Sequence, residues 1–284
     1  MKYACFTVGL PESTPEEAVK LMTRYGYHGI EWRTVSDKGD TTKPGFWSGN
    51  RATLQADWTD AQFKAVADMT RNEGLEMPNL GSYASAADWD QSRRMIDVAA
   101  LMGIPSARIN VTPYKGDTNY HELLEKHQEY YGRVVDYAKP RKVRPLIEIH
   151  HGTIVSSASA ARRFVTPWEP GDIGIIHDAG NMVHEGFENY RMGLEILGPY
   201  LAHVHVKNAA HVAEPADGPQ RLQWKGVWAP LRTGAVNLSD LMKALRAIGY
   251  DGWLSVEDFS TIHPQEAKVK DNIALLHEMA VYEV

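Results

Sequence analysis

The sequence has a single cysteine, Cys5, among 284 residues, so no disulfide can form within the chain. Lys and Arg number 30 against 36 Asp and Glu, and the resulting net charge of −6 disfavours a nucleic-acid partner. No apolar run reaches the roughly 18 residues that a membrane-spanning helix needs. The apolar start of the chain is interrupted by Pro11, too early for a signal peptide. We therefore expect a cytoplasmic protein without nucleic-acid or membrane partners.

Several common catalytic motifs are also missing. The chain has no Gly-x-Gly-x-x-Gly, no phosphate-binding Gly-Lys-Ser loop and no Gly-x-Ser-x-Gly, and the His121-Glu122 pair does not continue into His-Glu-x-x-His. These absences argue against a nucleotide-dependent or serine-hydrolase mechanism. The composition, 43% hydrophobic and 23% charged, is instead typical of a globular protein with a large core.

Short apolar or β-branched runs alternate with longer amphipathic runs from one end of the chain to the other. Eight parallel strands close a barrel, and no linker divides the sequence, so we predict a single (β/α)8 TIM barrel over residues 1–284. The expected strands are Tyr3–Val8, His28–Trp32, Glu76–Leu80, Ala107–Val111, Val143–Ile149, Ile173–His177, Leu201–Val206 and Trp253–Val256.

The first expected helix carries clear boundary signals, with Thr14 as N-cap, Pro15 in the first turn and Gly26 at the end. Three long connections, 35–57, 113–119 and 208–236, each follow a strand, so they should form loops over the mouth of the barrel. The other helices are expected at Thr59–Gly74, Asp88–Gly103, Tyr120–Ala138, Ala158–Phe164, Phe187–Leu197, Leu238–Ile248 and Pro264–Tyr282.

Acids and histidines lie where the last four strands end. Glu148 and His150 are two residues apart, and so are His205 and Lys207, which places each pair on one face of its strand. Because parallel strands of a barrel end at the same rim, these side chains should meet there. His203, deeper in its strand, is expected to be a hydrogen-bonded core residue, and His177 should face away from the rim.

The set Glu148, Asp178, His205 and Glu257 predicts a site for one divalent metal ion. Any one of these residues alone is more simply a solvated loop residue or a helix cap. Their succession on consecutive strands favours a functional site, because three carboxylates in a low-dielectric barrel repel one another without a cation. A set of mainly oxygen ligands suits Mg²⁺ or Mn²⁺.

The sequence resembles the xylose isomerase-like barrel superfamily of sugar-phosphate isomerases and epimerases. The similarity spans nearly the whole chain and is carried by GIEWR at 29–33, EIH at 148–150, HDAGN at 177–181, HVHVKN at 203–208 and GYDGWLSVE at 249–257. The family includes ketose epimerases, hydroxypyruvate isomerase, inosose dehydratase, 3-keto-glycoside lyases and a DNA-repair endonuclease. That endonuclease needs extra histidines, and the segment 77–82 offers none.

The resemblance implies that Glu148, Asp178, His205 and Glu257 hold the metal, and that the two glutamates move the proton next to a substrate carbonyl. Such chemistry passes through a metal-stabilised enediolate. Lys207 would neutralise the developing oxyanion, or else form an ion pair with a rim carboxylate. We expect the substrate-binding residues to be Glu31, Arg33, His150 and Asn181, and Trp47, Trp224 and Trp228 either to stack on a sugar or to pack in the mouth loops.

The function predicted first is therefore a metal-dependent isomerase or epimerase of a small keto sugar or sugar-like compound. The alternative is a lyase or dehydratase acting on a keto-inositol or 3-keto-glycoside at the same site. Asn181 and His211 stand where ketose 3-epimerases have a histidine and an arginine, which leaves the substrate open. A non-catalytic sugar sensor is disfavoured because both acid/base glutamates are present. Members of this family often form homo-oligomers, so the resemblance also allows one here.

Overall fold

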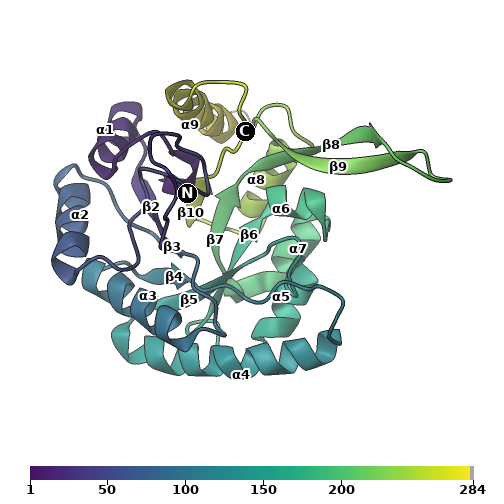
Figure 1. Ribbon diagram of the computed structural model, residues 1–284, viewed down its shortest axis with the longest axis horizontal. Helices are drawn as coiled ribbons and strands as arrows, with labels where there is room; N and C mark the ends of the chain where they lie inside the picture. The colour runs from purple at the N-terminus through teal and green to yellow at the C-terminus, as the bar shows by residue number, and fades with distance from the viewer. Residues whose placement is uncertain (282–284) are drawn as a thin grey trace.

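The computed structural model describes residues 1–281 and forms a closed barrel of parallel strands surrounded by helices (Figure 1). The strands follow one another around the barrel in the order β1-β10-β7-β6-β5-β4-β3-β2, and every neighbouring pair is parallel. The predicted TIM barrel is thereby confirmed. The barrel strands are β1 (Lys2–Phe6), β2 (Gly29–Thr34), β3 (Leu80–Ser82), β4 (Ser106–Arg108), β5 (Arg144–Glu148), β6 (Gly174–Asp178), β7 (Leu201–Val206) and β10 (Trp253–Val256).

The first two helices begin where the sequence places their caps. The side chains of Thr14 and Thr59 each accept a hydrogen bond from the third residue of the following helix, and Gly26 ends the first helix in the left-handed conformation. Tyr282, the expected last helical residue, lies outside the described residues. The helices are α1 (Pro15–Tyr25), α2 (Asp60–Asn72), α3 (Trp89–Met102), α4 (Tyr120–Ala138), α5 (Ala158–Val165), α6 (Ala179–His184), α7 (Tyr190–Leu197), α8 (Leu238–Ala247) and α9 (Gln265–Val281).

Two strands are shifted from their predicted positions. The expected strand at 76–80 makes only an isolated bridge at Glu76, because Pro78 has no N–H to donate to a ladder, and β3 begins at Leu80. The strand expected at 107–111 is confined to Ser106–Arg108. Beside the site, Phe6 packs over Gly81, where a β-carbon would collide with the phenyl ring. The ring of Phe6 also lies 5.6 Å from the ring of His205, which fixes the floor of the barrel mouth.

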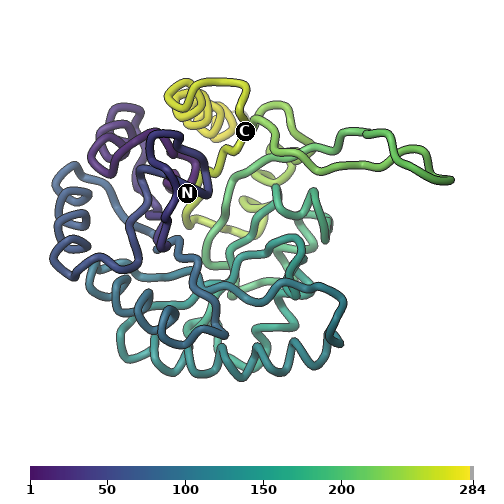
Figure 2. Tube along the Cα trace, in the orientation of Figure 1, coloured from purple at the N-terminus to yellow at the C-terminus, as the bar shows by residue number. Residues whose placement is uncertain are grey.

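The connection 208–236 is not the loop that was expected. It contains an antiparallel hairpin of β8 (Asn208–Pro215) and β9 (Leu222–Ala229), which extends away from the barrel (Figures 1 and 2). Gly218 and Arg221 adopt positive φ in its turn. The buried Asn208 side chain anchors the barrel end of the hairpin by donating to the carbonyls of Leu231 and Val236.

No helix within residues 1–281 is both long and apolar enough to cross a membrane.

Candidate active site

Four side chains converge at the carboxyl ends of neighbouring strands. Glu148 ends β5, Asp178 ends β6, His205 lies in β7, and Glu257 directly follows β10. All four are buried, and each offers a ligand atom within 4.8 Å of the others. The strand register produces this convergence, because Asp178 pairs with His205 across β6 and β7. The structure thus brings together every residue of the predicted ligand set.

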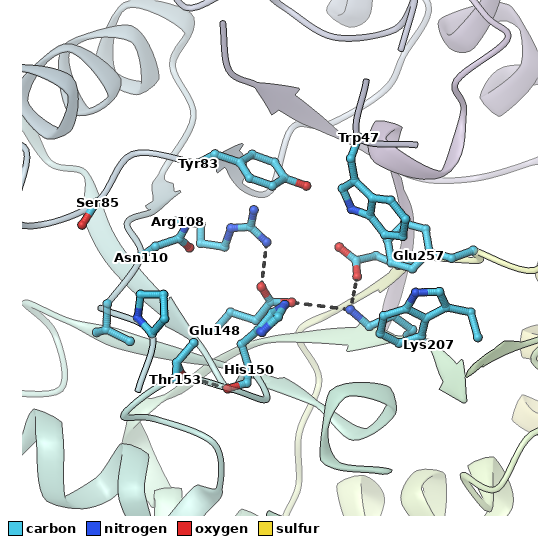
Figure 3. Close-up of a pocket in the computed structure, with 14 residues that line it drawn as sticks. Trp47, Tyr83, Ser85, Arg108, Asn110, Glu148, His150, Thr153, Lys207 and Glu257 are labelled. Atoms are coloured by element: carbon cyan, nitrogen blue, oxygen red, sulfur yellow. Dashed lines mark hydrogen bonds and ion pairs between the residues drawn. The ribbon is translucent and has the colours of Figure 1, made fainter. Parts of the chain in front are cut away.

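Lys207 occupies the centre of this cluster. Its Nζ lies 2.7 Å from Asp178 Oδ2. It also lies 2.5 Å from Glu257 Oε2 and 3.8 Å from Glu148 Oε1, two ion pairs that are drawn as dashed lines in Figure 3. The lysine is 3% exposed, so the ammonium is held by carboxylates rather than by water. Asp178 Oδ2 forms an ion pair with this ammonium but accepts no hydrogen bond, so it is a buried oxygen with unused acceptor capacity.

Arg108 is a site residue that the sequence analysis missed. Its Nη1 donates to Glu148 Oε2 at 2.7 Å, and its Nε donates to the carbonyl of Ser82 at 3.0 Å. The guanidinium lies over the ring of Tyr83, 4.5 Å from its centroid. Arg108 and Asn110 are two residues apart, as Glu148 and His150 are, and both line the same cavity. The spacing that singled out Glu148 and His150 could therefore have identified Arg108 as well.

The two glutamates lie in unequal electrostatic surroundings. Burial disfavours ionised Glu148, but Arg108, Lys207 and His205 outweigh burial, so the pKa of Glu148 lies well below its ordinary value. Burial is also the largest effect on Glu257, where Lys207 and His205 offset it only in part, and the pKa of Glu257 is raised. The carboxyl beside Arg108 therefore holds its charge more strongly than the carboxyl of Glu257 does.

Glu31 supports His205 from beneath. It is fully buried, its Oε1 lies 3.3 Å from His205 Nε2, and its Oε2 lies 3.0 Å from His203 Nε2. Asn79 donates to the same carboxylate at 2.7 Å. With one ring nitrogen facing Glu31, His205 directs its Nδ1 towards Glu148 at 3.0 Å. This is the arrangement by which a carboxylate orients a metal-binding imidazole.

A cavity of about 340 Å³ opens above the cluster (Figure 3). Glu148, Lys207 and Glu257 line its polar side. Three aromatic rings adjoin Lys207 and Glu257, with Phe259 4.9 Å from Trp47 and 5.3 Å from Trp228 between ring centroids. The Lys207 ammonium lies 5.2 Å from the centroid of Trp228 and 5.3 Å from that of Phe259. The cavity therefore combines ionic groups with flat apolar surfaces, as sugar-binding pockets do.

The predicted substrate-binding residues are distributed unevenly around this cavity. His150 lines it and stacks on His151, with ring centroids 4.3 Å apart. Glu31, Arg33 and Asn181 are not among the lining residues: Glu31 lies beneath His205, Arg33 is bonded within the mouth loop, and Asn181 donates to Glu148 Oε1 at 3.3 Å. Trp224 lies in the hairpin and is 66% exposed, so it also does not line the cavity.

The loop 35–57 is held in place by Asp37. This carboxylate binds Arg33 Nη1 at 2.9 Å and accepts the backbone N–H groups of Gly39 and Gly49, each at 2.9 Å. Arg33 in turn donates through Nη2 to the carbonyl of Trp47 at 3.0 Å. Arg33 thus positions the aromatic side of the cavity instead of contacting its interior.

This anchor predicts an acid-sensitive contribution to stability. Burial opposes ionisation of Asp37, but the N–H groups of Gly49 and Gly39 and the guanidinium of Arg33 outweigh burial and lower its pKa below 3.8. A depressed folded-state pKa stabilises the protein above the unfolded value and loses that effect as pH falls through the folded value. The unfolding free energy of the wild type should exceed that of Asp37→Asn at pH 7, and the difference should shrink below about pH 4. Denaturant titrations of both proteins across this range test it, and a pH-independent difference would contradict it.

Comparison with known proteins assigns the family. A family model described as "Xylose isomerase-like TIM barrel" matches residues 19–279. An inosose dehydratase of Lacticaseibacillus casei is 25% identical over 266 residues, which cover 87% of this chain and 82% of that protein.

Solved structures agree in fold. A xylose isomerase-like TIM barrel protein from Mycobacterium smegmatis in complex with magnesium has a TM-score of 0.68 at 18% identity and covers 98% of this chain and 96% of its own. The 3-keto-D-glucoside 4-epimerase of E. coli has a TM-score of 0.69 at 15% identity, and the match covers 98% of this chain and 99% of the epimerase. A D-allulose 3-epimerase from Methylomonas has a TM-score of 0.72 at 13% identity, and the match covers 98% of each chain. On the match of its sequence to the family model, this chain belongs to the xylose isomerase-like TIM barrel family.

Proposed function

We propose that the protein is a divalent-metal-dependent isomerase or epimerase of a small keto sugar or sugar-like compound. The observation that carries the proposal is the pair Glu148 and Glu257, which approach within 4.8 Å at the base of an aromatic-walled cavity and differ in their tendency to ionise. Two carboxyl groups whose pKa values are displaced in opposite directions suit a base and an acid.

The donor set fits a divalent cation. Three carboxylates and one imidazole converge, Asp178 Oδ2 accepts no hydrogen bond, and the cluster already attracts the ammonium of Lys207. Mg²⁺ and Mn²⁺ both prefer such oxygen-rich ligand sets. Glu148, Asp178, His205 and Glu257 would hold the ion, and an ion bound there supplies a Lewis acid for the substrate carbonyl and hydroxyl oxygens.

The side chains of the protein supply proton transfer, charge stabilisation and substrate positioning. Glu148, kept ionised by Arg108, takes the proton from the carbon next to the carbonyl, and Glu257 returns a proton to the resulting enediolate. The ammonium of Lys207 stabilises negative charge developing on the substrate oxygen. Trp47, Trp228 and Phe259 hold the apolar face of the substrate and exclude water.

A second candidate is a dehydratase working at the same site. It is favoured by the curated relatives, which are named inosose dehydratase. The first step is the same abstraction by Glu148, after which the C–O bond of a neighbouring hydroxyl breaks and the hydroxyl leaves as water with a proton from Glu257 or Lys207. The two candidates differ only in the fate of the enediolate.

A product screen separates them. Keto sugars, keto-inositols and 3-keto-glycosides would be incubated with the Mn²⁺-loaded protein in deuterated buffer and followed by mass spectrometry. An isomerase or epimerase conserves the mass of its substrate apart from incorporated deuterium, whereas a dehydratase removes one water. Binding without deuterium incorporation or mass loss in any compound would contradict both and indicate a sugar-binding protein without catalysis.

The role of Glu257 can be separated from metal binding. Glu257→Gln keeps an oxygen ligand and removes the titrating group, so turnover should fall by about 10²- to 10⁴-fold while metal content falls less. Asp258→Asn is the matched control, because the side chain of Asp258 bonds Ser260 and Asn272 instead of the cluster and should leave turnover nearly unchanged. If the Glu257→Gln variant binds metal fully and exchanges deuterium at the wild-type rate, Glu257 is a metal ligand and takes no part in proton transfer.

Glu31 provides a test of the metal site that does not require a substrate. Glu31→Gln weakens the orientation of His205, so the affinity for Mn²⁺ measured by calorimetry should fall by about 10- to 100-fold. Asp37→Asn removes a buried carboxylate from the mouth loop and should leave that affinity near the wild-type value. Equal Mn²⁺ affinity in Glu31→Gln and the wild type would show that Glu31 only fills the core.

A further inference from the structure

The ammonium of Lys207 binds the oxygen of Asp178 that a divalent ion would need. Asp178 uses Oδ1 to cap α6, where it accepts the N–H of Asn181 at 2.8 Å, so Oδ2 is the oxygen left for a cation. The ammonium lies 2.7 Å from this Oδ2. Glu148 is divided in the same way, because its Oε2 accepts from Arg108 and its Oε1 faces the cluster. Each of these two carboxylates therefore has one oxygen to offer.

The four candidate ligand atoms are spaced as the ligands of one ion. His205 Nδ1 is close to one oxygen of each carboxylate: 3.0 Å from Glu148 Oε1, 3.5 Å from Glu257 Oε1 and 3.7 Å from Asp178 Oδ2. Ligands about 2.1 Å from an ion lie about 3.0–3.5 Å apart in octahedral or tetrahedral geometry. Lys207 Nζ is within 3.8 Å of the same three carboxylates. The ammonium and the ion would thus occupy neighbouring positions in one small group of oxygens.

The charge of the cluster balances with only one of these two cations. Metal ligands bind in their deprotonated forms, so the three carboxylates bring three negative charges to the site. Arg108, paired with Glu148, offsets one of them. A divalent ion offsets the other two, and Lys207 then adds a surplus positive charge beside the ion. Because like charges a few ångströms apart repel strongly where water is excluded, a bound ion favours a more distant position of the ammonium.

The structure offers the ammonium such a position. Its Nζ lies 5.2 Å from the ring centroid of Trp228 and 5.3 Å from that of Phe259, and both rings line the cavity. An aromatic face attracts an ammonium within about 6 Å of its centroid. The base of the Lys207 side chain is fixed by Gly180, where a β-carbon would lie 2.8 Å from Lys207 Cβ and 2.7 Å from Cγ. Movement is therefore confined to the outer methylene groups and Nζ.

We propose that Lys207 is an exchangeable counter-ion of the metal site. When a divalent ion binds Asp178 Oδ2, the ammonium leaves this oxygen and turns towards Trp228 and Phe259. There it stays in the cavity and faces the substrate, where the charge on a substrate oxygen develops. The inference rests on the metal dependence proposed above, but it concerns the binding of the ion and not the reaction.

Calorimetric titration with Mn²⁺ tests the exchange without a substrate. Lys207→Met removes the ammonium and keeps a side chain of similar length, so its affinity for Mn²⁺ should exceed that of the wild type by at least about 10-fold. Lys268→Met is the matched control, because Lys268 is also buried, at 7% exposure, but donates to the backbone carbonyls of Asp258 and Ser260. The affinity of this control for Mn²⁺ should not rise above the wild-type value.

Thermal unfolding with and without Mn²⁺ separates displacement of the ammonium from mere repulsion. If the ion displaces Lys207, the Lys207→Met variant melts below the wild type after treatment with a chelator, and saturating Mn²⁺ removes that difference. If the ammonium stays among the carboxylates, a difference persists with Mn²⁺. Lys268→Met should lose the same stability in both conditions. Lys207→Gln provides a second neutral variant, and a variant that folds only with Mn²⁺ meets the same expectation.

Two results would overturn the proposal. The first is an affinity for Mn²⁺ in Lys207→Met and Lys207→Gln that is equal to or below that of the wild type. The second is an undiminished loss of stability in both variants at saturating Mn²⁺, which includes failure to fold there. Either result with Mn²⁺ bound to the wild type leaves the metal site intact and shows that ammonium and ion coexist. Absence of Mn²⁺ binding in the wild type and in all variants contradicts the metal dependence and this proposal together.

Discussion

The charge balance among buried carboxylates at the barrel mouth is the constraint on which the rest of the site depends. Glu148, Asp178 and Glu257 converge where water is largely excluded, and such a group is stable only beside positive charge. Lys207 provides that charge at the centre and Arg108 provides it at one side. The parallel barrel produces the convergence, because all its strands end at one rim.

The positive charges are distributed unevenly. Among the three carboxylates, Arg108 pairs with Glu148, whereas Lys207 lies closest to Asp178 and Glu257, so the two glutamates respond differently to the same degree of burial. In the proposed reaction, this inequality lets two identical side chains serve as a base and an acid. Glu31 adds a further contact to this cluster, because it orients the imidazole of His205 next to the three carboxylates.

Local signals in the sequence predicted the barrel and the convergence of Glu148, Asp178, His205 and Glu257, because strand ends and helix caps are encoded by short patterns. The β8–β9 hairpin was missed, because its strands lie in a stretch interpreted as one long loop, and pairing across a turn is not visible in either strand alone. Glu31 faces His205, which is distant in the chain, so this pairing becomes evident only once the fold is known. Arg33 binds Asp37 and the carbonyl of Trp47 within the loop that follows its own strand, and the path of that loop is not visible in the sequence.

A crystal structure of the protein grown with Mn²⁺, examined for anomalous scattering, tests the central claim most directly. The account predicts one strong peak between Glu148, Asp178, His205 and Glu257, with ligand distances of about 2.0–2.3 Å and with the ammonium of Lys207 moved off the shared carboxylate position. If no peak is found at this position at saturating Mn²⁺ and Lys207 remains among the carboxylates, the metal site is contradicted. The cluster would then be a structural ion-pair network.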